Sequence, residues 1–159
     1  MNMISIADQI GADFISVARL AGVSLPENAV TIEKLAAPHL PPSRLPAGKM
    51  AVYVFARGND TLKVGKVGAK SQARYTSQHY NPGSAMSTLA ASILSDAGNH
   101  SLTEDEIARV GQWIRANVDR ANFLIDESLG MRVLALLEAF IQCRLNPKYE
   151  GYKSQAAIG

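Results

Sequence analysis

The chain has 159 residues, the size of one domain and enough to bury a hydrophobic core. Hydrophobic residues make up 47% and charged residues 19%, a composition typical of globular proteins and not of disordered ones. The formal net charge of +2 is compatible with a polyanionic partner but selects none. One cysteine, Cys143, excludes an intrachain disulfide and a cysteine-based zinc site, and we expect it to be buried. No apolar run approaches the roughly 18 residues that span a bilayer, so a cytoplasmic location without membrane contact is expected.

The first 48 residues predict a helical N-terminal extension with a proline-rich arm. Apolar side chains recur at spacings of three and four over residues 4–20 and predict an amphipathic helix that ends at Gly22. A second short helix is expected over residues 31–37, after which the prolines from Pro38 to Pro46 favour an extended arm. The first helix is expected to pack on the rest of the chain or on a second copy, so a homodimer through this helix is one alternative.

Two β-rich segments, residues 50–55 and 61–66, flank Gly58-Asn59-Asp60 and predict a hairpin. Side chains alternate along a strand, so each segment presents two faces. The expected buried face carries Val52, Val54, Leu62 and Val64. The opposite face then carries Tyr53, Phe55, Lys63 and Gly65, which makes Tyr53 and Lys63 near neighbours.

The second half of the chain predicts mainly helices. A short helix is expected from Ser71, another over residues 87–94, and a longer one that opens at the capping box Thr103-Glu104-Asp105-Glu106. Residues 122–125 predict a strand, and an apolar helix follows Gly130. These elements predict an α+β domain over residues 49–151, a small three-stranded antiparallel sheet flanked by helices, and then a tail, 152–159.

Glu138 is the one acid in the apolar run 134–147. On a helical period it shares a face with Leu134, Ile141 and Leu145, so it must be hydrated, paired or bound to a cation. This placement makes Glu138 a candidate metal ligand. The alternative is an ion pair with Arg74 or Lys63 that serves structure only.

The order of unusual polar residues resembles the GIY-YIG nuclease family. The family's Gly-Ile-Tyr motif resembles Ala51-Val52-Tyr53, and its Tyr-Ile-Gly motif resembles Lys63-Val64-Gly65, in which lysine replaces tyrosine. Arg74 and His79 stand where the family places phosphate-handling groups. The segment 137–141 resembles the family's metal-binding glutamate helix, and 122–125 resembles the strand before it. The family's asparagine aligns with Glu150, with Asn146 as an uncertain substitute.

The resemblance implies a divalent-metal-dependent endonuclease that hydrolyses DNA phosphodiester bonds. Glu138 would hold one Mg²⁺ or Mn²⁺ ion, and Arg74 would grip the scissile phosphate. Tyr53 would deprotonate or position the attacking water, with its pKa lowered by cationic surroundings. His79 would share the proton transfer or bind an adjacent phosphate, and Lys63 would add positive charge. All of these side chains are expected to converge in one solvent-open cleft.

Three further residues are candidate nucleic-acid contacts. Lys66 and Lys70 extend the basic cluster of the hairpin, and Tyr80 follows it closely in the sequence. A solvated charged strand edge is the alternative for the lysines. DNA is expected ahead of RNA as the partner. Two other functions stay open: a non-catalytic nucleic-acid-binding module on the same scaffold, and a structural or protein-binding domain in which Glu138 forms an ion pair.

Overall fold

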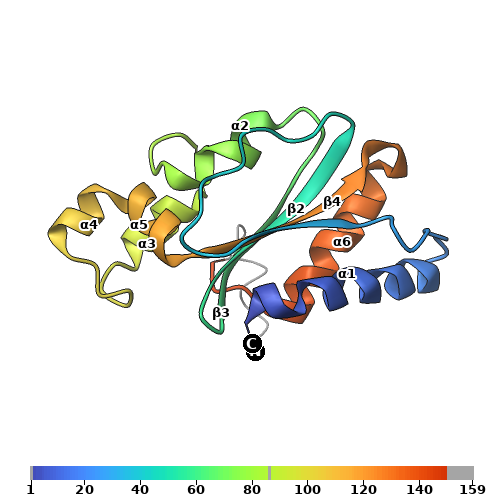
Figure 1. Ribbon diagram of the computed structural model, residues 1–159, viewed down its shortest axis with the longest axis horizontal. Coiled ribbons are helices and arrows are strands. Elements are labelled where there is room, and N and C mark those ends of the chain that lie inside the picture. The colour runs from blue at the N-terminus through green and yellow to red at the C-terminus, as the bar shows by residue number, and fades with distance from the viewer. Residues whose placement is uncertain (1, 86, 150–159) are drawn as a thin grey trace.

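The protein is an α+β structure built on one antiparallel sheet, as the computed structural model shows for residues 2–85 and 87–149 (Figure 1). Four strands lie in the order β1-β4-β2-β3. They are β1 (Thr31–Leu35), β2 (Lys49–Arg57), β3 (Asp60–Val67) and β4 (Asp119–Asp126). The α+β class is therefore confirmed, and the expected three-stranded sheet is corrected to four strands.

The additional strand replaces the helix expected over residues 31–37. Thr31–Leu35 pairs antiparallel with β4, from Thr31 opposite Leu124 to Leu35 opposite Arg120. The helix prediction is wrong because backbone pairing with a strand about ninety residues later in the chain overrides a weak local preference. The segment before residue 49 thus supplies an edge strand as well as a helix.

Helices cover both faces of the sheet. They are α1 (Met3–Leu20), α2 (Gln72–Thr76), α3 (Leu89–Ser95), α4 (Glu104–Ala108), α5 (Val110–Asn117) and α6 (Gly130–Leu145), with short 3-10 helices η1 (Gln78–Tyr80) and η2 (Glu127–Leu129). The capping box at Thr103 is confirmed, but the helix it opens breaks at Arg109 into α4 and α5. The expected helix over residues 4–20 is α1, and Gly22 follows its C-cap with a φ of 84°.

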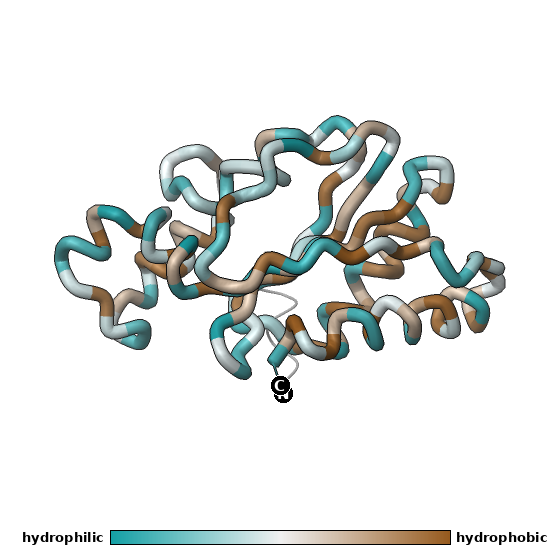
Figure 2. The backbone as a smooth tube through the Cα atoms, in the orientation of Figure 1, coloured by the Kyte–Doolittle hydropathy of each residue, from teal (hydrophilic) through white to brown (hydrophobic). Residues whose placement is uncertain are grey.

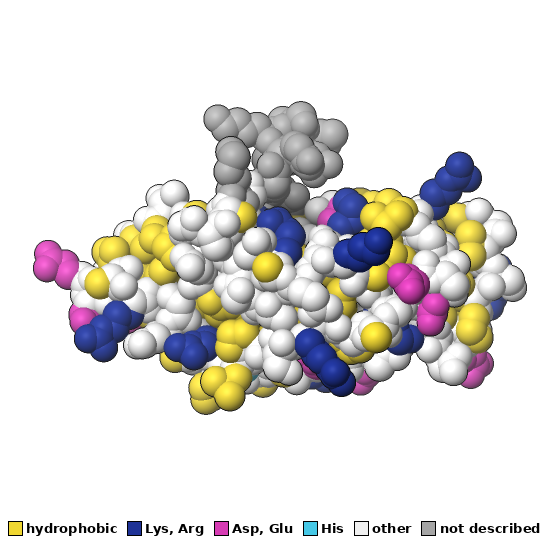
Figure 3. Space-filling model, turned by 90° about the horizontal axis from the view of Figure 1, so that it is seen from above, with side chains coloured by type: hydrophobic (Ala, Val, Ile, Leu, Met, Phe, Trp, Pro, Cys, Tyr) yellow, Lys and Arg dark blue, Asp and Glu magenta, His cyan; other side chains and the backbone are white. Residues whose placement is uncertain are grey.

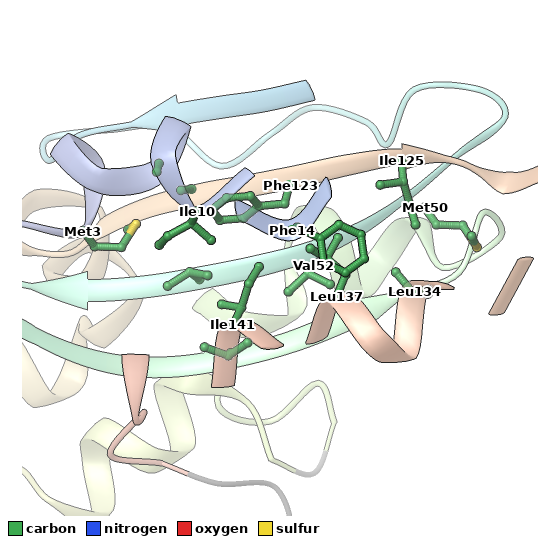
Figure 4. Packing of buried hydrophobic residues seen from close by; sticks show 14 of the residues in the cluster. Met3, Ile10, Phe14, Met50, Val52, Phe123, Ile125, Leu134, Leu137 and Ile141 are labelled. Atoms are coloured by element: carbon green, nitrogen blue, oxygen red, sulfur yellow. The ribbon is translucent and has the colours of Figure 1, made fainter. Parts of the chain in front are cut away.

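Helices α1 and α6 pack on one face of the sheet. Phe14 of α1 and Leu137 of α6 are fully buried and meet Val52 of β2 in this cluster (Figure 4). Apolar and polar segments alternate along α1, as a helix with one buried face requires (Figure 2). An ion pair between Arg144 and Asp13, 2.9 Å long, joins the two helices at the surface.

The opposite face carries a second cluster under α2, η1, α3 and α5. Tyr53 and Phe55 of β2 belong to this cluster, while Val52 and Val54 belong to the first, so the predicted alternation along β2 is confirmed. Leu62 is the exception, because it packs with Tyr53 and not with Val64. A β-bulge opposite Phe55 and Ala56 inserts Leu62 into β3 and turns it to the other face.

Two smaller expectations have clear outcomes. Cys143 is exposed, and not buried as expected, because it lies on the outer side of α6. In the part of the chain that the structure describes, no helix combines the length and apolarity needed to cross a bilayer. Glu150 and the tail 152–159 lie outside the described residues.

Candidate active site

A row of residues crosses all four strands on the face covered by α2 and η1. Glu33 of β1 stands opposite Asn122 of β4, Asn122 opposite Tyr53 of β2, and Tyr53 opposite Gly65 of β3. Residues that pair directly across strands point to the same face. The row therefore connects a surface carboxylate at one edge of the sheet to the Tyr53 ring near the other edge.

Tyr53 lies directly over Gly65. A Cβ atom added at Gly65 would stand 2.2 Å from the Tyr53 hydroxyl oxygen and 2.5 Å from Cζ, far inside contact distance. Any side chain at position 65 would therefore displace the ring. This contact gives a physical reason for glycine at the end of the Lys63-Val64-Gly65 motif, because the tyrosine of the first motif needs the space.

Tyr53 is completely buried, and no described residue makes a well-formed hydrogen bond to its hydroxyl, although the Arg74 guanidinium lies within reach of it. Burial raises the pKa of the hydroxyl above its ordinary value, although the Arg74 and Arg120 guanidinium groups lower it. Glu138 lies near enough to raise the same pKa further. The expectation that cationic surroundings lower the pKa of Tyr53 is thus wrong in sign, because desolvation outweighs the charges.

His79 of η1 stacks against Tyr53, with 4.5 Å between the ring centroids. Its Nδ1 accepts a hydrogen bond from the backbone N–H of Leu89 at 3.1 Å, so the neutral ring carries its proton on Nε2. Burial, reinforced by Arg74, Lys63 and Arg120, lowers the pKa of His79 to about 2. In this environment the ring is neutral near neutral pH and can donate a hydrogen bond through Nε2, which suits the phosphate-binding role of the two roles expected for His79.

Three cations surround the buried pair of rings. Arg74, at the C-terminal end of α2, is half-buried, whereas Lys63 is 3% exposed on the same sheet face as Tyr53. Arg120 of β4 is fully buried, with its Cζ 5.8 Å from the Tyr53 ring centroid. The orphaned Nε2 of His79 adds a hydrogen-bond donor. A buried cluster of positive charge of this kind is complementary to an anion.

Glu138 lies on the other side of the sheet from Tyr53, beside Lys66 of the edge strand β3, which stands opposite Val52. Helix α6 lies on the face opposite Tyr53, and the Glu138 carboxylate meets Lys66 at 2.8 Å. The side chain of Glu138 is 18% exposed. Glu138 thus forms an ion pair, which is the structural alternative to a metal site. Its partner is Lys66, and not Arg74 or Lys63 as expected. No group of three or more acidic, histidine or cysteine side chains capable of holding a metal occurs among the described residues.

The predicted nucleic-acid contacts are separated. Lys66 is engaged by Glu138, Lys70 is exposed in the loop after β3, and the Tyr80 hydroxyl points inward to His39 at 2.7 Å. On the face seen in Figure 3, Lys and Arg side chains are spread singly, with acidic side chains among them. This face carries no continuous basic track.

The structure therefore brings Tyr53, Lys63, Arg74 and His79 together, and it leaves Glu138 on the opposite face of the sheet, near enough to influence the pKa of Tyr53. The expectation of a solvent-open cleft is wrong, because η1 and its His79 ring cover Tyr53. Arg74 and Glu138 are the members of the set that remain accessible to solvent.

Sequence reasoning missed two residues of this site, Arg120 and Asn122. Both are fully buried on the Tyr53 side of β4, whereas Ala121 and Phe123 face the other cluster. A signal was available, because polar and apolar residues alternate along 120–123 with the period of a strand. An arginine and an asparagine at alternating positions of a buried strand indicate a polar network inside the core.

Comparison with protein-family models, with curated proteins and with solved structures finds no match for this chain. The resemblance to the GIY-YIG nucleases therefore depends on the residues and geometry given above.

Proposed function

We propose that the protein is a divalent-metal-dependent endonuclease that hydrolyses DNA phosphodiester bonds, at a site formed by Tyr53, Arg74, His79 and Glu138. The observation that supports it best is the buried pair of orphaned polar groups, the Tyr53 hydroxyl and His79 Nε2, beneath Arg74. Buried polar groups without partners are rare in proteins, and they are often completed by a ligand. The cations around them favour an anionic ligand, such as a phosphodiester.

Glu138 can supply one carboxylate ligand to a metal ion. It offers one carboxylate, and one of its oxygens is held by Lys66. Mg²⁺ is commonly bound by one or two carboxylates and keeps several of its waters, so a single solvent-accessible acid suits it. When bound, such an ion would stabilise negative charge on the leaving oxygen. Lys66 must give up the carboxylate for this to happen.

The remaining roles belong to the protein's own side chains. Arg74 binds the scissile phosphate with two parallel N–H donors. Access to the Tyr53 hydroxyl requires η1 and its His79 ring to move away from Tyr53. Tyr53, protonated at rest, orients the attacking water, and His79 donates from Nε2 to a phosphate oxygen. The water oxygen bonds to phosphorus as the bond to the 3′ oxygen breaks. The attacking water gives one proton to bulk water, and the 3′ oxygen takes one proton from bulk water, so the hydrolysis balances.

The second candidate is a nucleic-acid-binding module without catalysis. The ion pair between Lys66 and Glu138 favours it, because it occupies the acid that a metal would need. The burial of Tyr53 favours it as well, since a hydroxyl closed off from solvent meets no water.

Incubation of supercoiled plasmid with the purified protein and Mg²⁺ or Mn²⁺ separates the two candidates. The nuclease predicts metal-dependent nicking that Arg74→Ala and Glu138→Ala abolish and that Arg19→Ala, an exposed control in the last turn of α1, leaves intact. A gel shift without nicking in the unaltered protein supports the binding module. Absence of both nicking and salt-sensitive binding rejects both candidates.

A further inference from the structure

The guanidinium group of Arg120 is a buried charge held by neutral partners. Its Nε donates to Oδ1 of Asn122 at 2.8 Å, and Nη2 donates to the carbonyl oxygen of Tyr75 at 2.6 Å. A longer contact of 3.4 Å joins Nη1 to the Tyr80 hydroxyl. The residue has no exposed surface, so neither water nor a bound substrate reaches it.

Arg120 forms no salt bridge with any residue that the structure describes. The Glu33 carboxylate connects to it only through Asn122, whose Nδ2 donates to Glu33 at 3.1 Å. Removing an ion from water costs several kcal/mol unless a partner compensates for it. A neutral side chain could fill the same space at a lower cost, so the charge itself requires an explanation.

Aromatic rings surround this charge. The Cζ atom of Arg120 lies 5.0 Å from the ring centroid of Phe55, 5.1 Å from that of Tyr75 and 5.8 Å from that of Tyr53. These distances lie within the ~6 Å range of cation–π attraction. Strand pairing fixes the arrangement, because Arg120 stands opposite Phe55 and its neighbour Asn122 stands opposite Tyr53.

We propose that Arg120 is a positioning residue of the candidate active site, which holds the Tyr53 ring over Gly65 and supplies a permanent positive charge to its hydroxyl oxygen. The catalytic consequence rests on the proposed nuclease function. Arg74 cannot supply this charge throughout the reaction, because it moves onto the phosphate. Arg120 stays in place, since its hydrogen bonds lie inside the fold.

Four other charged or titratable groups lie near Tyr53 or His79, and none of them supplies a fixed positive charge to Tyr53. Arg74 of α2 moves onto the phosphate in the proposed reaction, Glu138 of α6 is an acid that raises the pKa of Tyr53, and His79 of η1 is neutral at neutral pH. Lys63 of β3 stands opposite Phe55 and lowers the pKa of His79, but it is not among the groups that shift the pKa of Tyr53. Burial is the largest influence on the pKa of Tyr53 and raises it, and Arg120 is among the groups that lower it.

The test measures the ionisation of residue 53 directly and needs no enzymatic activity. 3,5-Difluorotyrosine, whose phenol ionises at lower pH than that of tyrosine, replaces Tyr53 in the full chain, and ¹⁹F NMR follows its titration. Arg120→Met is expected to raise the apparent pKa by about one unit or more, a tenfold change in ionisation constant. Arg120→Lys, which keeps the charge, is expected to raise it less. Arg115→Met on α5 removes a nearby surface arginine and is expected to leave it unchanged.

An apparent pKa that is the same in Arg120→Met and Arg115→Met overturns the proposal. If thermal unfolding shows that Arg120→Met does not fold, Arg120→Gln replaces it, because its neutral amide keeps hydrogen-bond donors for Asn122 and the Tyr75 carbonyl. The same rise is expected there, and its absence overturns the proposal equally. Failure of the unaltered protein to nick DNA rejects the nuclease function, but it leaves the titration result valid.

Discussion

Gly65→Ala tests whether Tyr53 occupies the position on which the site depends. The added Cβ would lie 2.2 Å from the Tyr53 hydroxyl oxygen, whereas ordinary contact begins at 3.4 Å. The ring cannot retreat freely, because His79 stacks against it with 4.5 Å between centroids. Overpacking of this kind costs about 1–3 kcal/mol, and the gain from replacing glycine within a strand returns about 0.5–1 kcal/mol. We expect a net loss of about 1–2 kcal/mol in the free energy of unfolding.

Thermal and urea unfolding measure this loss against a matched control. For a chain of this length, about 1 kcal/mol lowers Tm by roughly 2–4 °C. Gly68→Ala, one residue beyond β3, meets nothing within 4 Å and is expected to change stability by less than about 0.5 kcal/mol. In a Tyr53→Leu background, which removes the clashing atoms, the cost of Gly65→Ala should largely disappear. Equal stability of Gly65→Ala and Gly68→Ala would refute the placement of the ring.

Three other predictions concern the same site. Tyr53→Phe removes a hydroxyl without a well-formed hydrogen bond, so calorimetry should show a change of less than about 1 kcal/mol in stability, and a larger loss would mean that the hydroxyl is bonded. Folding lowers the pKa of His79 from 6.5 to about 2. The neutral ring therefore stabilises the folded state fully above pH 6.5, and the free energy of unfolding falls by about 1.4 kcal/mol for each pH unit below that value. His79→Asn, which keeps an acceptor near Nδ1, should flatten this slope in urea unfolding between pH 6 and 4, and an unchanged slope contradicts the assignment. Lys66→Met frees Glu138 and should strengthen Mn²⁺ binding in calorimetric titration, whereas unchanged binding would remove Glu138 as the ligand.

Short-range sequence patterns correctly predicted several helices and one hairpin. The spacing of apolar residues predicted α1 and α6, the capping box predicted the start of α4, and β-rich segments around a glycine turn predicted the β2–β3 hairpin. Each of these signals lies within one element or between neighbours in the sequence. These elements can therefore be predicted from the sequence without knowledge of the tertiary contacts.

The errors arise where distant segments meet. Thr31–Leu35 forms a strand because it pairs with β4. Leu62 points to the other face because of a β-bulge, for which the local sequence carries no recognisable signal. Tyr53 was placed on the correct face, but its burial depends on η1 folding over it. The partner of Glu138 was likewise misjudged, because the position of α6 relative to the edge of β3 decides that it is Lys66.

The comparison of Tyr53→Phe with Tyr75→Phe tests the nuclease proposal most directly. Both tyrosines are fully buried and neither hydroxyl makes a well-formed hydrogen bond to a described residue, so the two variants match in structural effect. In a plasmid-nicking assay with Mg²⁺ or Mn²⁺, Tyr53→Phe removes the hydroxyl that orients the attacking water and should lower the rate by about 100-fold or more. Tyr75→Phe should nick at the rate of the unaltered protein. Equal nicking by both variants would contradict the role given to Tyr53.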